Sequence, residues 1–126
     1  MGAQRPRTVV LDAGALIAID RGERRLLRLL ELAGAVHFPA GALAQAWRNP
    51  ARQVRLARLV GAAEVTIHPF DETVAKAAGA LCAATATADV IDASVVLLSR
   101  AVEGVLVTSD PVDMRRLDPA IDLALC

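Results

Sequence analysis

The segment TVVLD, residues 8–12, constrains the fold more than any other part of the chain. Three apolar residues, two of them β-branched, end in a carboxylate, and a short apolar stretch over 13–19 follows. A continuous apolar run of this length is typical of a strand buried on both faces of a parallel sheet. Residues 105–110, VLVTSD, repeat the pattern. In parallel sheets, ligands bind beyond the carboxyl ends of the strands, so we expect Asp12 at that edge.

Strand-like and helix-like segments alternate along the rest of the chain, which is typical of α/β proteins with a parallel central sheet. We predict strands at 8–12, 35–38, 64–68, 105–108 and 121–125, and helices at 13–19, 23–33, 41–48, 50–60, 72–84, 89–102 and 111–117. Gly34 is expected to end the helix before it. Asn49 and Pro50 are expected to begin the helix 50–60, and Asp71 to cap the helix 72–84. Residues 1–7 are expected to form a loose tail, and residues 1–126 a single domain.

Composition excludes several classes of protein. Hydrophobic residues make up 55% of the chain, yet no apolar run reaches the roughly 18 residues of a membrane helix. The basic start does not lead into a signal-peptide core, so we expect a cytoplasmic protein without a membrane partner. Cys82 and Cys126 are too few for a disulfide framework or a cysteine metal site. An aromatic content of 2% does not supply a base-stacking platform for single-stranded nucleic acid.

Carboxylates occur in three segments that are far apart in sequence. Asp12 and Asp110 follow the two apolar strands, and Asp92 lies in the predicted helix 89–102. Asp92 is at the margin of the apolar stripe of that helix, where a half-buried ligand belongs, whereas Asp89 points further away. With the Thr108 hydroxyl nearby, this is an all-oxygen set of the kind that Mg²⁺ or Mn²⁺ prefers. Such ions can activate a water and stabilise a leaving oxygen in phosphodiester cleavage.

Each aspartate also has a structural explanation. Asp89, and less easily Asp92, would favour the dipole at the start of a helix. Asp110 precedes a proline, as N-cap residues often do, and Asp12 could cap the helix after it. The coincidence of three such residues at one predicted edge favours the metal site.

The chain resembles PIN-domain ribonucleases, such as the VapC toxins of bacterial toxin–antitoxin pairs. The resemblance covers about residues 8–117 and rests on VVLDAGALIAI (9–19), LAQAWRNPARQVRLARL (43–59), DVIDASVVLLSRA (89–101) and VLVTSD (105–110). It implies a three-layer α/β/α fold and a Mg²⁺- or Mn²⁺-dependent endonuclease that acts on RNA. It also implies Asp12, Asp92 and Asp110 as catalytic metal ligands with Asp89 in support, a cognate antitoxin, and frequently a homodimer.

One residue departs from the family pattern. The family usually has a glutamate in the segment that reads LAQAW here, and this chain has Gln45. Glutamine keeps an oxygen ligand but loses a charge, which would weaken metal binding and could shift the preference toward Mn²⁺. The alternative function is therefore a catalytically silent PIN-like module that binds RNA or a protein partner.

Basic residues follow Gln45 in a stretch without acidic residues. The resemblance implies that Arg48, Arg52 and Arg55 position the RNA backbone, and a solvated helix face is the alternative. We assign no role to His37 or His68.

Other phosphoryl-transfer folds fit the sequence less well. A haloacid-dehalogenase-like site needs an aspartate at position 14, which is glycine here, and a receiver-like site needs a lysine after a late strand, whereas Lys76 is the only lysine. A glycine-rich dinucleotide turn after the first strand is also missing.

Overall fold

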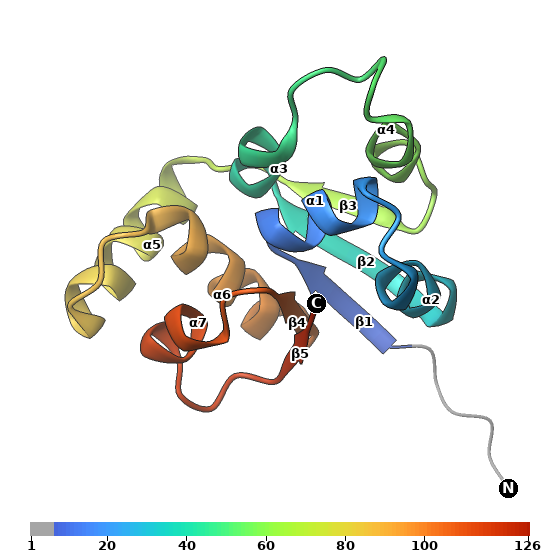
Figure 1. Cartoon of the computed structure of the whole chain (residues 1–126). Helices are drawn as coiled ribbons and strands as arrows, with labels where there is room; N and C mark the ends of the chain where they lie inside the picture. The colour runs from blue at the N-terminus through green and yellow to red at the C-terminus, as the bar shows by residue number, and fades with distance from the viewer. Residues whose placement is uncertain (1–6) are drawn as a thin grey trace, which may run out of the picture.

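Five strands form one parallel sheet in the order β3–β2–β1–β4–β5 (Figure 1). The computed structural model describes residues 7–126, so the predicted tail lies outside the described residues except for Arg7, which begins β1. The strands are β1 (Arg7–Leu11), β2 (Ala33–Pro39), β3 (Val65–His68), β4 (Val105–Thr108) and β5 (Leu123–Leu125). The helices are α1 (Ala13–Asp20), α2 (Arg24–Leu32), α3 (Ala40–Ala46), α4 (Val54–Val60), α5 (Glu72–Thr85), α6 (Val90–Val102) and α7 (Pro111–Leu117).

Strand β1 occupies the centre of the sheet, as its uninterrupted apolar sequence predicted. Val9, Val10 and Leu11 are all buried, and β1 pairs with β2 on one side and β4 on the other. Beyond the exposed Arg7 and half-buried Thr8 at its start, β1 is enclosed by strands on both sides and helices on both faces, which is why its apolar run does not alternate.

The helices form two layers around the sheet, which confirms the three-layer α/β/α prediction (Figure 1). Helices α1, α2 and α4 pack on one face, and α6 packs on the other with α5 and α7 beside it. Helix α3 contacts both α1 and α6, so it joins the two layers near the carboxyl edge of the sheet. None of the described helices has both the length and the apolar character to cross a membrane alone; α5 and α6 meet those criteria only together, with a bend of 103° between them.

The connections from β1 and β4 diverge at this edge. β1 leads through α1 and α2 to β2, whereas β4 leads through α7 on the opposite face to β5. Two adjacent parallel strands whose connections leave toward opposite faces create a crevice beyond their carboxyl ends. Asp12 and Asp110 follow these two strands and therefore lie at this crevice.

Gly104 allows the start of β4 to approach β1 closely, at the end of the strands opposite to the crevice. Helix α6 ends at Glu103, whose φ of 52° turns the chain into β4. A Cβ on Gly104 would lie 3.2 Å from the Thr8 carbonyl oxygen and 3.1 Å from a methyl of Val10. A side chain at this position would therefore require the neighbouring atoms to shift by a few tenths of an ångström.

Most predicted boundaries agree with the structure to within two residues, but the start of α4 and the role of Gly34 were predicted wrongly. Helix α4 begins at Val54, not at Pro50, because the Gln53 side chain accepts hydrogen bonds from the backbone N–H groups of Arg48 and Asn49 and closes a loop before the helix. Gly34 does not end α2, since it lies within β2. The Asp71 cap is confirmed: its carboxylate accepts from the Val74 N–H at 2.9 Å.

Candidate active site

Asp12 is held between the first turn of α1 and the end of β4. Its Oδ1 accepts a hydrogen bond from the Ala15 N–H at 2.8 Å, so it caps α1, and its Oδ2 accepts from the Thr108 hydroxyl at 2.6 Å. The residue is only 3% exposed. Burial raises the pKa of Asp12, and nearby Asp110 raises it further, while the two hydrogen bonds act in the opposite direction. The helix-cap explanation for Asp12 is therefore correct, but it accounts for only one of its two oxygens.

Thr108 connects the ends of β1 and β4. Its buried hydroxyl donates to Asp12 and accepts from the Asp110 N–H at 2.9 Å. Gly14 supports the same contact from α1, since a Cβ at that position would collide with the Ser109 hydroxyl. The sequence placed Thr108 near the site, and the structure shows that it orients Asp12 and the backbone at Asp110.

Asp92 lies in the first turn of α6 and is half-buried, as its position beside the apolar stripe predicted. Desolvation raises its pKa to about 7, and the negative charges of Asp89, Asp12, Asp110 and Asp113 add to the effect. Four carboxylates are thus close enough to Asp92 to resist its ionisation. The raised pKa favours the protonated form of Asp92 near neutral pH, and a cation that offset the surrounding charge would lower it again.

Asp89 and Asp110 differ in how they begin their helices. The Oδ1 of Asp89 accepts from the N–H groups of Ile91 and Asp92, so the cap explanation for Asp89 is correct. Asp110 occupies the cap position of α7, but its side chain makes no cap hydrogen bond. Its exposed carboxylate is therefore available to a ligand at the crevice.

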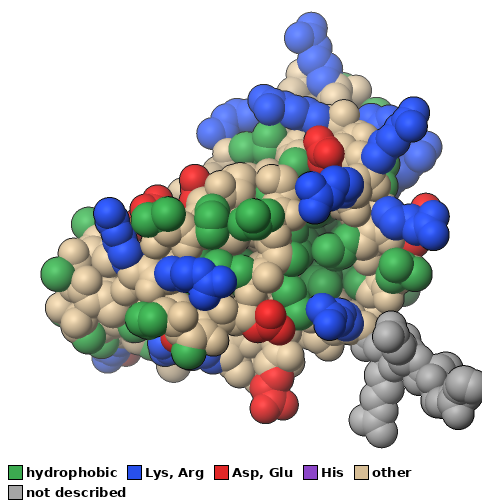
Figure 2. All heavy atoms as spheres, turned by 60° about the horizontal axis from the view of Figure 1, so that its bottom comes forward, with side chains coloured by type: hydrophobic (Ala, Val, Ile, Leu, Met, Phe, Trp, Pro, Cys, Tyr) green, Lys and Arg blue, Asp and Glu red, His purple; other side chains and the backbone are tan. Residues whose placement is uncertain are grey.

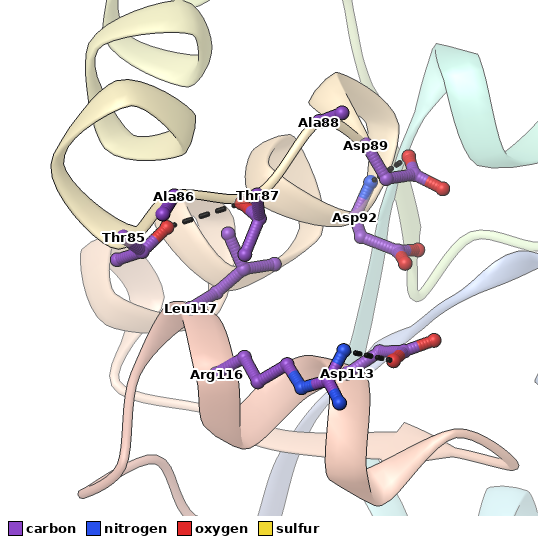
Figure 3. Close-up of a pocket in the computed structure, with 9 residues that line it drawn as sticks. All are labelled: Thr85, Ala86, Thr87, Ala88, Asp89, Asp92, Asp113, Arg116 and Leu117. Carbon is purple, nitrogen blue, oxygen red and sulfur yellow. Dashed lines mark hydrogen bonds and ion pairs between the residues drawn. The ribbon is translucent and has the colours of Figure 1, made fainter.

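Sequence reasoning missed Asp113. This residue lies in the first turn of α7, and its carboxylate is one of those that raise the pKa of Asp92. Figure 3 shows the carboxylates of Asp89, Asp92 and Asp113 pointing toward the same side. The available signal was spacing, because residues three apart at a helix start share a face, which puts Asp113 on the side of Asp110.

The chemistry of these donors fits a hard divalent cation, although their positions do not form a ready coordination shell. Within residues 7–126, no three acidic, histidine or cysteine side chains lie close enough together to hold a metal ion. None of the ion pairs found among residues 7–126 involves Asp12, Asp92 or Asp110. Among the described ion pairs only that of Asp113 with Arg116, at 4.0 Å, involves one of the carboxylates around Asp92. A metal would therefore relieve the remaining carboxylate repulsion, and binding it would require the exposed carboxylates to turn inward.

Gln45 is exposed near the end of α3. It lies one turn after Gly41, and Gly41 packs directly against Ile91 in the first turn of α6. Residues four apart share a helix face, so Gln45 lies on the side of α3 that faces the start of α6.

The three arginines have different surroundings, although Lys and Arg side chains gather at the end of the molecule formed by α3, α4 and their connecting loop (Figure 2). Arg48 donates to the carbonyl oxygens of Ala44 and Trp47 at the end of α3, and Arg52 is exposed in the loop before α4. Arg55 lies on α4 and donates to the Asp20 carbonyl oxygen at 3.5 Å. Arg52 and Arg55 do not share a helix face, because α4 begins only at Val54, after Gln53.

His37 and His68 form a pair at the edge of the sheet. Their ring nitrogens Nδ1 and Nε2 lie 2.8 Å apart, and burial together with the neighbouring His68 lowers the pKa of His37. Each ring therefore serves as the hydrogen-bond partner of the other.

Comparison with known proteins identifies the fold. No protein-family model and no curated protein matches the sequence. Among solved structures, VapC20 of Mycobacterium tuberculosis, described as a sarcin–ricin loop cleaving toxin, matches with a TM-score of 0.64 and 14% identity over 78% of this chain and 86% of that chain. FitAB bound to an IR36 DNA fragment matches with a TM-score of 0.65 and 15% identity, over 93% and 94%. VapBC2 from Rickettsia felis, bound to a DNA fragment from its promoter, matches with a TM-score of 0.67 and 16% identity, over 94% and 98%.

The chain thus has the PIN-like α/β/α fold of these toxin systems, as the resemblance implied. At 14–16% identity the likeness concerns the fold, so function has to be argued from the site.

Proposed function

We propose that this chain is a metal-dependent endoribonuclease and the toxin of a toxin–antitoxin pair. The observation that supports this most is the group of carboxylates around Asp92, which come from three separate segments and lie near enough to Asp92 to raise its pKa. The PIN-like fold shared with VapC20, whose substrate is the sarcin–ricin loop, gives the second line of support.

Asp12, Asp92 and Asp110 would hold Mg²⁺ or Mn²⁺, with Asp89 in support. The ion, when bound, supplies an activated water and charge stabilisation for the leaving oxygen of a phosphodiester. Thr108 keeps the Asp12 carboxylate oriented toward the crevice through its hydrogen bond, and the Ala15 N–H fixes the other oxygen. Arg48, Arg52 and Arg55 would contact RNA phosphates, which position the substrate without selecting its sequence.

The test is cleavage of a structured RNA pool by the purified chain with Mn²⁺ or Mg²⁺, and then with EDTA. Asp12→Asn is a suitable inactive variant, because asparagine can still accept from the Ala15 N–H and bond to Thr108. Asp122→Asn, an exposed charge outside the site, is the matched control. Metal-dependent cleavage that Asp12→Asn loses and Asp122→Asn keeps would support the proposal. Equal activity of both variants would point to a contaminating nuclease.

A silent RNA-binding or protein-binding module is the second candidate. It is favoured by the neutral Gln45 and by the lack of a ready metal shell among residues 7–126. If the natural chain binds RNA without cutting it, and Gln45→Glu restores metal-dependent cleavage, this second function is correct.

The same proposal includes an antitoxin partner and a homodimer. FitAB and VapBC2, which share the fold, are each bound to DNA in their solved structures. We expect a small protein encoded beside this chain to form a stable complex with it and to abolish its cleavage. Analytical ultracentrifugation of the chain alone would show whether it is a homodimer, and the same measurement with that protein would give the stoichiometry of the complex.

A further inference from the structure

A cavity of about 470 Å³ lies between the α5–α6 linker and α7, beside the carboxylates of the candidate active site (Figure 3). Asp92 lines this cavity and also belongs to the carboxylate group, so a molecule in the cavity would adjoin the proposed reaction centre. The volume falls within the range of about 300–1,000 Å³ that is typical of small-molecule sites.

The wall formed by the linker is fixed by its own hydrogen bonds. The Thr85 hydroxyl donates to the Leu81 carbonyl oxygen and lies 3.1 Å from the Thr87 hydroxyl, and the Thr87 N–H donates to the Cys82 carbonyl oxygen. Ala86 between them adopts a left-handed conformation with φ of 54°. The cavity is thus bounded by a defined turn that continues directly into the start of α6.

The opposite wall has an acceptor and a donor side by side. On α7, Asp113 and Arg116 approach each other to 4.0 Å, and their side chains are 58% and 68% exposed. An ion pair this long and this exposed is weak, so both groups keep most of their hydrogen-bonding capacity. Leu117, which is buried, adds an apolar surface between them and the linker.

A carboxylate and a guanidinium on one wall match one nucleobase better than the others. Guanine has two adjacent donors, N1–H and N2–H₂, which suit the two oxygens of a carboxylate. It also has two adjacent acceptors, O6 and N7, which suit the fork of an arginine. Adenine lacks both of these pairs, cytosine lacks the pair of adjacent donors, and uracil has a single ring N–H donor. Bases that are unpaired can present both edges to a protein.

We propose that this cavity binds an unpaired guanine next to the phosphodiester that is cleaved, with Arg116 on the acceptor edge and Asp113 on the donor edge. The inference rests on the proposed ribonuclease function, because it places the base beside the candidate metal ligands. It makes the substrate class more specific: single-stranded or looped RNA with a guanine adjacent to the cut.

The experiment measures binding separately from cleavage. The full chain with Asp12→Asn is titrated into fluorescein-labelled hexanucleotide RNAs in an adenine–uracil context, with guanine, inosine or adenine at one central position. Inosine lacks only the N2 amino group of guanine. We expect guanine to bind about tenfold more tightly than inosine or adenine, since one good bidentate contact corresponds to about 1–3 kcal/mol.

Three variants of α7 provide the matched comparison. Arg116→Gln should remove the preference for guanine over adenine, and Asp113→Asn the preference for guanine over inosine, which lacks the amino group on the donor edge. Arg115→Gln should keep both preferences, because Arg115 does not line the cavity and donates to the Pro119 carbonyl oxygen instead. Ala88→Phe, which fills the cavity from the linker, should remove both preferences. Circular dichroism would verify that each variant is folded.

Equal affinity for the three RNAs, no RNA binding, or equal effects of Arg116→Gln and Arg115→Gln would overturn the inference. So would variants that leave RNA binding unchanged but weaken a complex with a protein partner, since the cavity would then belong to that partner. Cleavage by the natural chain with Mn²⁺ is scored independently. Cleavage without a guanine preference contradicts only this inference, and a guanine preference without cleavage contradicts only the nuclease proposal.

Discussion

Thr108 shows how a single hydroxyl can organise the ends of two strands. It is fully buried, donates to the Asp12 carboxylate and accepts from the Asp110 N–H. A valine of the same shape would leave a buried carboxylate oxygen and a backbone N–H without their partner. Leaving such groups unpaired costs about 1–3 kcal/mol each in protein mutants.

We therefore expect Thr108→Val to lower the free energy of unfolding by about 2 kcal/mol, as measured by urea denaturation. Thr108→Ser keeps the hydroxyl and should retain most of the stability. Because the lost hydrogen bond stabilises ionised Asp12, the valine variant should also raise the pKa of Asp12, which NMR titration of its side-chain carboxyl would detect. A valine variant as stable as the natural chain would contradict the role that we assign to Thr108.

Asp92 makes stability depend on pH through its raised pKa. The folded state holds the Asp92 proton up to about pH 7, whereas the unfolded chain releases it near pH 4. Within that window the folded state binds more protons, so the free energy of unfolding falls as pH rises and becomes constant above about pH 7.

Asp92→Asn removes this contribution. In EDTA we expect the variant to be more stable than the natural chain at pH 8, by about 1–2 kcal/mol after allowance for solvent screening, and equally stable at pH 4. Chemical denaturation at both pH values would measure the difference. If Asp92→Asn were no more stable than the natural chain at pH 8, the pKa of Asp92 would not be raised in the folded state.

At the scale of secondary structure, α5 and α6 begin in the same way but serve different purposes. Asp71 caps α5 and Asp89 caps α6, each through a carboxylate oxygen bonded to backbone N–H groups of the first turn. Only Asp89 lies beside the carboxylate group around Asp92. Comparing variants of Asp71 and Asp89 therefore separates the effect of losing a helix cap from the effect of losing a carboxylate at the site.

Serine can cap a helix but provides no carboxylate, so Asp71→Ser and Asp89→Ser should both fold with nearly natural stability. We expect Asp89→Ser alone to weaken Mn²⁺ binding, by about tenfold, as supporting residues of metal sites do when mutated. Isothermal titration calorimetry with Mn²⁺ would compare the two variants. An equal loss in both would show that Asp89 acts only through the helix.

At the scale of the whole molecule, the position of the site follows from the order of the strands. β1 and β4 are neighbours, yet they are separated by most of the chain, and the helices that follow them lie on opposite faces. A cation at their carboxyl ends would join segments that belong to different halves of the fold. Metal binding should therefore stabilise the entire domain and not one element of it.

Mn²⁺ at a hundred times its dissociation constant should raise the free energy of unfolding by about 2.7 kcal/mol, and EDTA should reverse the effect. Asp110→Asn should abolish the response, while Asp122→Asn, outside the site, should keep it. Thermal unfolding monitored by circular dichroism would measure all three proteins. A response in Asp110→Asn equal to that of the natural chain would place the metal elsewhere.

Local sequence patterns determined much of the fold. The apolar runs of β1 and β4, the stripe of α6 and the Asp71 cap depend on neighbours along the chain, and the structure contains all of them. The same patterns identified Asp12, Asp92 and Asp110, because residues that directly follow parallel strands or begin a helix reach the carboxyl edge of the sheet.

Only the tertiary structure decided how those residues are arranged. Gln53 moved the start of α4 through bonds to the preceding loop, and Thr108 tied Asp12 to the end of β4. Asp113 lies among the carboxylates around Asp92, and Arg116 faces the α5–α6 linker across a cavity. These contacts connect residues through space, and their energies depend on burial and on nearby charges, which a pattern of residue types along the chain does not specify.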